Sequence, residues 1–210
     1  MYEELLGYIR KISNPYLRQA VEYYFVKDEA FIKSFKGHSA AKTVHHGFAG
    51  GLLEHTLSVT KMCEYFANAY DILNADLLYA SAVCHDIGKT KELSNFPDND
   101  YTDIGQLVGH IVIGVEMIGE AIRTIPDFPE KLANEWKHCI VAHHGELEYG
   151  SPKKPALAEA VALNLADNAD AKMQTLKEIF KDKSGTDWLG YNRLFESNLR
   201  KTSLSEESKS

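Results

Sequence analysis

The sequence predicts an all-α protein. Apolar residues recur at helical spacing along almost the whole chain, and no segment shows a convincing strand pattern or an internal repeat. The 210 residues, 44% hydrophobic and 25% charged, suffice for one sizeable core but are few for two full domains. We therefore expect a single helical domain over residues 1–200.

The elements follow from periodicity and from breaking residues. An N-terminal pair over residues 2–36 comprises a helix over 2–12, closed by Asn14-Pro15, and one over 16–36, ended by Gly37. The core over 44–181 contains a Gly-rich connection and helices over 52–70, 75–88, 103–124, 129–144 and from about Pro155 to 181. A last helix over 187–200, with Trp188 and Tyr191, is expected to pack on the core, the alternative being a dimer contact, and 201–210 to be a disordered tail.

Charge and composition exclude several classes of protein. The formal net charge of -7 argues against extended binding of duplex nucleic acid, although bound metals would still allow a small anionic substrate. No run of about 18 apolar residues predicts a membrane span, and the N-terminus does not resemble a signal peptide. The three separated cysteines are expected to be buried free thiols, which favours a reduced, cytoplasmic setting.

His85-Asp86 is the first candidate for chemistry. The pair lies in the apolar segment ASAVCHDIGK, where burial of both groups is unfavourable unless they are paired or bound to a cation. A satisfied His–Asp hydrogen bond is the alternative interpretation. Lys89 follows directly, either as a solvated surface residue or as a partner for substrate phosphate.

Two further positions extend this pair. His55 lies on an apolar helical pattern, where a single histidine is more often a packed core residue than a metal ligand. Asp167 has apolar neighbours and shares a helical face with Asp170, the alternative being surface carboxylates. Together, two imidazoles and two carboxylates on separate helices suit Mn, Fe, Ni, Co or Zn better than Ca. A metal-free interpretation would require a separate explanation at each position.

Three more histidines suggest a second metal. His110 lies in an apolar helix, and His143-His144 end another, so these three with a bridging Asp86 would form a binuclear centre. A core role is more plausible for His144, because adjacent helical residues point about 100° apart. His45 precedes a Gly-rich stretch and either approaches the substrate or has a capping or loop role.

The order His55, His85-Asp86 and Asp167 resembles the H…HD…D motif of the HD superfamily, and His110, His143 and His144 match the additional histidines of its binuclear members. The segments VHHGFAGGLLEHTLSV, LLYASAVCHDIGKTKELS, GHIVIG, AHHGELEYGSPKKP and ADNADAKM are similar to the YhaM-type bacterial 3′–5′ exoribonucleases, over roughly residues 5–200. The resemblance implies an HD-domain helical bundle that holds one or two divalent metals per chain, with manganese favoured.

Two departures bear on the substrate. Members of the YhaM type usually carry an N-terminal OB-fold that grips single strands, and no β-rich segment of that size is expected in these 210 residues. A short single-stranded RNA, a nucleotide or a cyclic dinucleotide is therefore a candidate substrate. The HD-GYP cyclic-dinucleotide enzymes are less similar, because Gly150-Ser151-Pro152 replaces Gly-Tyr-Pro and Gly51 replaces a Glu.

We therefore expect a metal-dependent phosphohydrolase, and specifically a phosphodiesterase, in which a metal-activated water attacks phosphorus. Asp86 and Lys89 are the expected catalytic residues, and His45, Lys89 and Lys153 or Lys154 the expected substrate-binding ones. The alternatives are a nucleotide phosphomonoesterase, a cyclic-dinucleotide phosphodiesterase and a non-enzymatic nucleotide-binding regulatory domain. No membrane partner is expected, and the sequence leaves the oligomeric state open, a homo-oligomer included.

Overall fold

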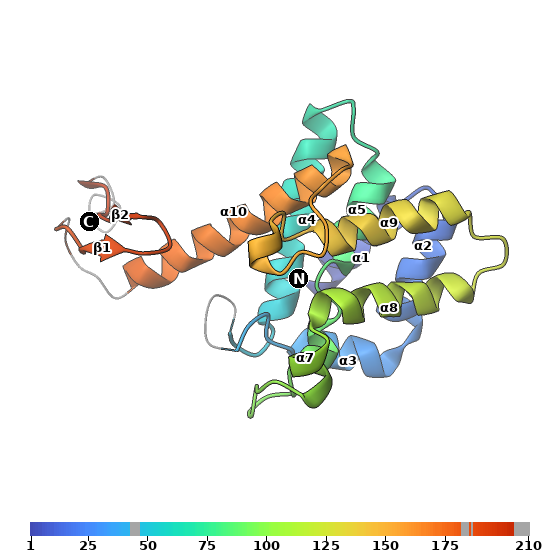
Figure 1. The fold of residues 1–210 in the computed structure, drawn as a ribbon, viewed down its shortest axis with the longest axis horizontal. Coiled ribbons are helices and arrows are strands. Elements are labelled where there is room, and N and C mark those ends of the chain that lie inside the picture. The colour runs from blue at the N-terminus through green and yellow to red at the C-terminus, as the bar shows by residue number, and fades with distance from the viewer. Residues whose placement is uncertain (43–46, 182–184, 186, 204–210) are drawn as a thin grey trace. The chain divides into compact units, whose positions relative to one another are not determined.

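The computed structural model describes residues 1–42, 47–181, 185 and 187–203. Two compact units, Met1–Lys172 and Met173–Ser210, divide the chain. Most of the described residues are helical and very few are in strands, which confirms the predicted all-α class (Figure 1). Whether residues 1–200 behave as one domain stays a prediction.

The first unit begins with three short helices, α1 (Tyr2–Lys11), α2 (Pro15–Glu22) and α3 (Glu29–Gly37), with a π-helix (Tyr23–Lys27) between the last two. The Asn14 side chain accepts hydrogen bonds from two backbone N–H groups of α2, and Pro15 suits its first turn. The single helix predicted over 16–36 is wrong. The backbone is extended at Asp28, whose carboxylate caps α3 through the N–H of Phe31.

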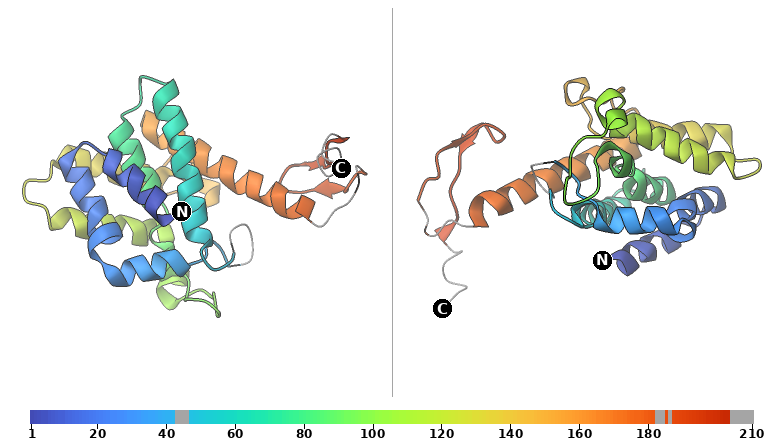
Figure 2. Two further views of the ribbon diagram at one scale, coloured as in Figure 1. Left: turned by 180° about the vertical axis from the view of Figure 1, so that it is seen from behind. Right: turned by 90° about the horizontal axis from the view of Figure 1, so that it is seen from below.

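The core of this unit is built on α4 (Gly51–Ala69), α5 (Ala75–Cys84), α8 (His110–Arg123) and α9 (Glu130–Ala142). Every residue from Leu77 to Cys84 is buried, so α5 lies in the interior, as its apolar composition suggested. Contacts join α5 to α4 and α9, and α8 lies beside α9 (Figure 1). The N-terminal helices contact α4 and α5 and are seen best in the rear view of Figure 2. All three cysteines are buried and free.

Two one-turn helices connect α5 to α8. They are α6 (Lys89–Glu92) and α7 (Asp103–Leu107). The continuous helix predicted over 103–124 is therefore wrong. Gly109 adopts φ +78, which glycine tolerates and a right-handed helix excludes, so the chain turns and α8 starts at His110.

A loop with a short 3₁₀ helix (Leu147–Tyr149) connects α9 to α10 (Ala158–Lys181). The predicted start of α10 at Pro155 is three residues too early. Within Met1–Lys172, α10 carries Asp167 and Asp170.

The predicted C-terminal helix over 187–200 is wrong. Two strands of two residues, β1 (Tyr191–Asn192) and β2 (Ser197–Asn198), pair antiparallel in this segment. Positive φ at Gly190 and Glu196 interrupts any helix, and Trp188 and Tyr191 are exposed instead of packed in a core. Residues 204–210 of the predicted tail lie outside the described residues.

No helix among the described residues is long and apolar enough to cross a membrane.

Candidate metal centre

The predicted site residues lie at helix ends and on helix faces that meet inside Met1–Lys172. His55 lies near the start of α4, and His85-Asp86 follows the buried helix α5 directly. His110 is the first residue of α8, and His143-His144 follows α9. Because α5 is surrounded by other helices, the turn after Cys84 places Asp86 in the interior, where it is 2% exposed.

Asp86 directs its two carboxylate oxygens toward different imidazoles. Its Oδ2 atom lies 3.4 Å from Nε2 of His55 and 3.4 Å from Nε2 of His85. Its Oδ1 atom lies 3.6 Å from Nε2 of His110 and 3.7 Å from Nε2 of His143. One carboxylate therefore stands between two groups of ligand atoms.

The first cluster consists of His55, His85 and Asp167, whose ligand atoms all lie within 4.8 Å of one another. Nε2 of His55 lies 3.1 Å from Nε2 of His85 and 3.2 Å from Oδ1 of Asp167. With Asp86, this cluster offers two nitrogen and two oxygen donors, a mixture typical of divalent transition-metal sites.

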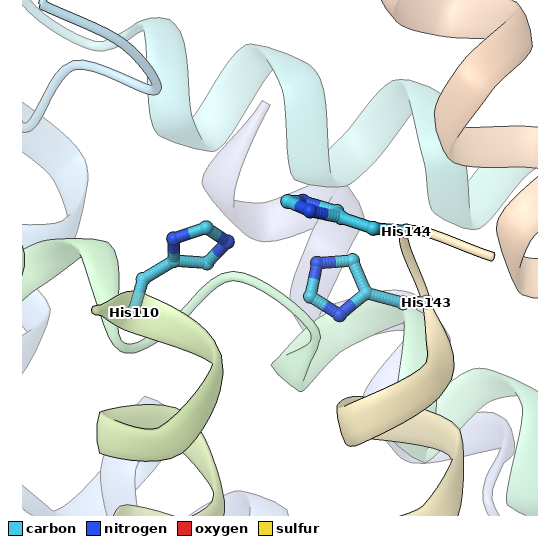
Figure 3. Close-up of side chains that lie close together, drawn as sticks. All are labelled: His110, His143 and His144. Atoms are coloured by element: carbon cyan, nitrogen blue, oxygen red, sulfur yellow. The ribbon is translucent and has the colours of Figure 1, made fainter. Parts of the chain in front are cut away.

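The second cluster consists of His110, His143 and His144, again with ligand atoms within 4.8 Å of one another. In Figure 3, His110 approaches from the start of α8 and the other two rings from the end of α9, and the three rings face a common space. The structure therefore brings His144 into the cluster, although adjacent residues of a helix point apart. Its position after the last turn of α9 allows both rings to face His110.

All five imidazoles have the same orientation relative to their surroundings. In each, Nδ1 lies within hydrogen-bond distance of an acceptor, so that Nε2 is the ring nitrogen that faces the site, where a cation could bind. The acceptors are an Asp170 oxygen for His55 (2.7 Å), Ala82 O for His85 (2.8 Å), Glu92 Oε1 for His110 (3.0 Å), Ile140 O for His143 (2.6 Å) and Tyr149 O for His144 (2.8 Å).

Three buried atoms indicate that a cation fits at the second cluster. Oδ1 of Asp86, Nε2 of His110 and Nε2 of His143 have no hydrogen-bond partner among the described residues. Leaving such polar atoms buried and unpaired is unfavourable by about 1–3 kcal/mol each. Since all three are metal-ligand atoms that converge, a divalent metal would satisfy them together.

The electrostatics favour a charged Asp86 carboxylate and neutral imidazoles at His143 and His144. Burial opposes the charge on Asp86, but Lys89 and His85 hold the pKa of its carboxyl well below the usual range. Burial lowers the pKa of His143 and of His144, and the neighbouring histidines lower both further. Neutral imidazole is the form that binds metal.

The first cluster differs, because carboxylates surround His55. Burial opposes its protonation, but hydrogen bonds to Asp167, Asp170 and Asp86 outweigh this and raise the pKa of His55 well above its ordinary value. Burial likewise opposes the charge on Asp167, and His55 lowers its pKa in spite of this.

Two carboxylates beside the site were not predicted from the sequence. Asp170 was interpreted only as a helix-surface neighbour of Asp167, yet it is 7% exposed and contacts Nδ1 of His55 and the Ser58 hydroxyl. Glu92 contacts His110. The i, i+3 spacing of Asp167 and Asp170 was an available signal for the first, whereas nothing local marks Glu92.

The expected substrate-binding residues differ in where the structure places them. Lys89 is 16% exposed, and its ammonium lies 2.7 Å from Oδ2 of Asp86. Lys153 is exposed on the loop before α10, and its neighbour Lys154 pairs with Glu146. His45 lies outside the described residues.

Comparison with known proteins identifies the family. The model of the HD domain matches residues 52–172, which is more than half of the chain and includes every clustered histidine and aspartate described above. The chain belongs to the HD domain family. This membership confirms the resemblance found in the sequence and makes the chain a metal-dependent phosphohydrolase, an enzyme of the hydrolase class.

Curated relatives of this HD domain protein are 3′–5′ exoribonucleases named YhaM. Those of Halalkalibacterium halodurans and Bacillus subtilis are each 38% identical to it, over 84% of this chain and 54% and 55% of their own lengths. The protein of a Geobacillus species is 38% identical over 84% of this chain and 53% of its own. The chain thus spans about half the length of the curated relatives it matches. No solved structure gave a significant match.

Proposed function

We propose that this HD domain protein is a two-metal phosphodiesterase whose substrate is a short single-stranded oligoribonucleotide or a related nucleotide phosphoester. The observation that carries the proposal is the Asp86 carboxylate, whose Oδ2 faces His55 and His85 and whose Oδ1 faces His110 and His143. A carboxylate with ligand atoms on both sides suits a bridge between two ions.

The two metal subsites have different ligands. The first subsite consists of His55, His85, Asp167 and the Oδ2 atom of Asp86, and the second of His110, His143, His144 and the Oδ1 atom of Asp86. Mixed nitrogen and oxygen donors suit Mn, Fe, Ni, Co or Zn, and the similarity to the YhaM type favours Mn²⁺. Metals bound there would neutralise phosphate charge and lower the pKa of a water molecule.

Lys89 is the proposed residue that neutralises the substrate phosphate. Burial opposes its charge, but Asp86 outweighs burial and raises the pKa of the ammonium, so Lys89 stays charged at neutral pH. Its ammonium already lies beside the carboxylate at the centre of the site. Metal ligation by Asp86 would free this cation to donate hydrogen bonds to a phosphate oxygen.

The loop before α10 is the proposed edge of the substrate site. Its backbone is attached to the second cluster, because Tyr149 O accepts from Nδ1 of His144. The loop exposes the Tyr149 side chain and the charged Lys153. An aromatic ring and a cation suit a nucleobase and a phosphate respectively, which favours a nucleotide-containing substrate.

The names of the relatives support the RNA part of the proposal, since each is a 3′–5′ exoribonuclease. Because this chain spans only about half of their length, the oligonucleotide length that it degrades is to be measured on the chain itself. The products of the same assay distinguish this phosphodiesterase from a phosphomonoesterase and from a cyclic-dinucleotide enzyme.

The test is hydrolysis of a short single-stranded RNA labelled at its 5′ end, with metal-free protein and added Mn²⁺. Release of nucleoside monophosphates and stepwise shortening are expected. Inorganic phosphate from a nucleoside monophosphate would indicate a phosphomonoesterase, and cleavage of a cyclic dinucleotide alone a different diesterase. No turnover of any of these with Mn²⁺, Co²⁺, Ni²⁺, Fe²⁺ or Zn²⁺ would contradict the proposal.

Matched variants connect that activity to the site. Asp86→Asn preserves the shape of the side chain and removes its charge, so it should abolish turnover. Asp98→Asn makes the same change on an exposed loop and should leave turnover unchanged.

A further inference from the structure

Glu92 lies directly behind His110, on the side away from Asp86. Its Oε1 atom is 2.9 Å from the backbone N of His110 and 3.0 Å from Nδ1 of the same residue. The Glu92 side chain is 12% exposed, so water competes little for this carboxylate. One oxygen thus contacts both the first N–H of α8 and the imidazole that begins it.

This contact determines which ring nitrogen of His110 faces the site. With Nδ1 turned toward Glu92, Nε2 lies 3.6 Å from Oδ1 of Asp86 and is buried without a hydrogen-bond partner among the described residues. Figure 3 shows the His110 ring turned toward His143 and His144. A carboxylate that accepts from Nδ1 keeps the lone pair on Nε2, where a metal can bind.

Close backbone packing fixes the position of Glu92. Its carbonyl oxygen accepts from the backbone N of Thr102 at 2.9 Å. A Cβ atom on Gly105 would lie 2.1 Å from that oxygen, and one on Gly88 would lie 2.0 Å from the His110 carbonyl oxygen. Glycine at both positions therefore lets α6 approach α7 and the start of α8 directly.

The second cluster has one orienting group that is charged. His143 and His144 direct Nδ1 to the carbonyl oxygens of Ile140 and Tyr149, whereas His110 directs it to a carboxylate. Glu92 thus places a carboxylate behind the second cluster, where the other two orienting groups are neutral carbonyls.

We infer that Glu92 is a positioning residue of the second subsite, which acts through His110 to direct Nε2 at the metal and to strengthen binding there. The inference rests on the proposed two-metal function. Asp170 has the equivalent position behind His55 in the first subsite. Replacing each of these two carboxylates should therefore weaken the binding of a different metal ion.

The test is calorimetric titration of metal-free protein with Mn²⁺, together with elemental analysis after dialysis. Wild type should bind two ions per chain. Loss of a carboxylate behind a ligand histidine weakens metal binding about 10–100-fold. Glu92→Ala should therefore lower the affinity for one of the two ions by that factor and leave the affinity for the other unchanged. Asp170→Asn should weaken binding of the other ion by a similar factor, and the double variant should weaken binding of both.

A structural role for Glu92 needs its own control, because the same carboxylate caps α8. Glu92→Gln retains an acceptor for the His110 backbone N–H and removes the charge, so it should keep the metal-free melting temperature and bind the weakened ion with intermediate affinity. Glu116→Gln removes a carboxylate from the exposed face of α8 and should bind two ions as wild type does.

The outcomes distinguish the inference from the proposed function. If wild type and Glu92→Ala both bind two ions with the same affinities, the inference is overturned and the two-metal site stands. An equal weakening of both ions, in proportion to a lower metal-free melting temperature, would likewise overturn it in favour of a structural role. Wild-type protein that binds fewer than two ions would contradict the two-metal site and this inference together.

Discussion

The ammonium of Lys89 lies 2.7 Å from Oδ2 of Asp86, and both side chains are largely buried. Two residues separate them in the turn that follows α5 and precedes α6. This ion pair places a fixed cation beside the carboxylate that faces both histidine clusters. Lys89 therefore supplies, in the metal-free protein, part of the positive charge that a bound metal would supply.

Replacing Lys89 with Met should destabilise the metal-free protein, because removal of one partner of a buried ion pair typically costs about 3–5 kcal/mol. Saturating Mn²⁺ should recover most of this loss, since the metal would compensate the charge of Asp86. Urea unfolding with and without Mn²⁺ measures both. The exposed Lys91→Met is the matched control in the same helix. Equal destabilisation of Lys89→Met in both conditions would refute the compensation.

Gly88→Ala should lower stability by about 1–3 kcal/mol or more, the usual range for overpacking. Its new Cβ would lie 2.0 Å from the His110 carbonyl oxygen and 2.8 Å from the Gly114 backbone N, and backbone cannot move aside as a flexible side chain can. At Gly37 nothing lies within 4 Å of such a Cβ, so Gly37→Ala is the control and should change stability little. Thermal unfolding of both variants compares them, and equal melting temperatures would contradict the close approach of α6 and α8.

His138 should make the stability of the metal-free protein depend on pH. Burial lowers its pKa below the ordinary 6.5, and Nε2 accepts a hydrogen bond from the backbone N of Ala156 at 2.9 Å. As pH falls through 6.5, His138 is therefore protonated in the unfolded chain before it is protonated in the folded one. The stability that His138 contributes above pH 6.5 is lost as the pH falls toward the lower pKa of the folded state.

Urea unfolding of wild type and His138→Leu, with a chelator, measures this contribution. The stability difference between the two proteins should shrink as pH falls below about 6.5. A difference that is constant or grows at low pH would show that His138 is not held neutral in the folded state.

The sequence predicted the helical class and the residues that converge, and the physical reason is the same for both. Buried helices need apolar faces, so His85 and Asp86 at the end of such a face have to meet other polar groups. The structure brings the two predicted sets of histidines and aspartates together around Asp86. That these particular residues hold two metal ions is the proposal to be tested.

The orienting carboxylates could not be predicted in the same way. Glu92 and His110 are 18 residues apart, and Asp170 and His55 are 115 apart, so both contacts depend on how helices cross. The break between α7 and α8 at Gly109 could not be predicted for a related reason. Periodicity continues across that glycine, whereas the positive φ that ends α7 is a property of the folded backbone. Sequence periodicity also gave a wrong prediction at residues 187–200. The apolar spacing there suggested a helix, but Trp188 and Tyr191 are exposed, so burial does not stabilise one.

The most direct test of the two-metal site is the metal content of Asp86→Ala compared with wild type, measured by elemental analysis after equilibration with Mn²⁺ and dialysis. The account predicts about two ions per chain for wild type and the loss of both from a variant that keeps its helical circular dichroism spectrum, because this carboxylate serves both subsites. Two ions retained by Asp86→Ala, or none bound by wild type, would contradict it.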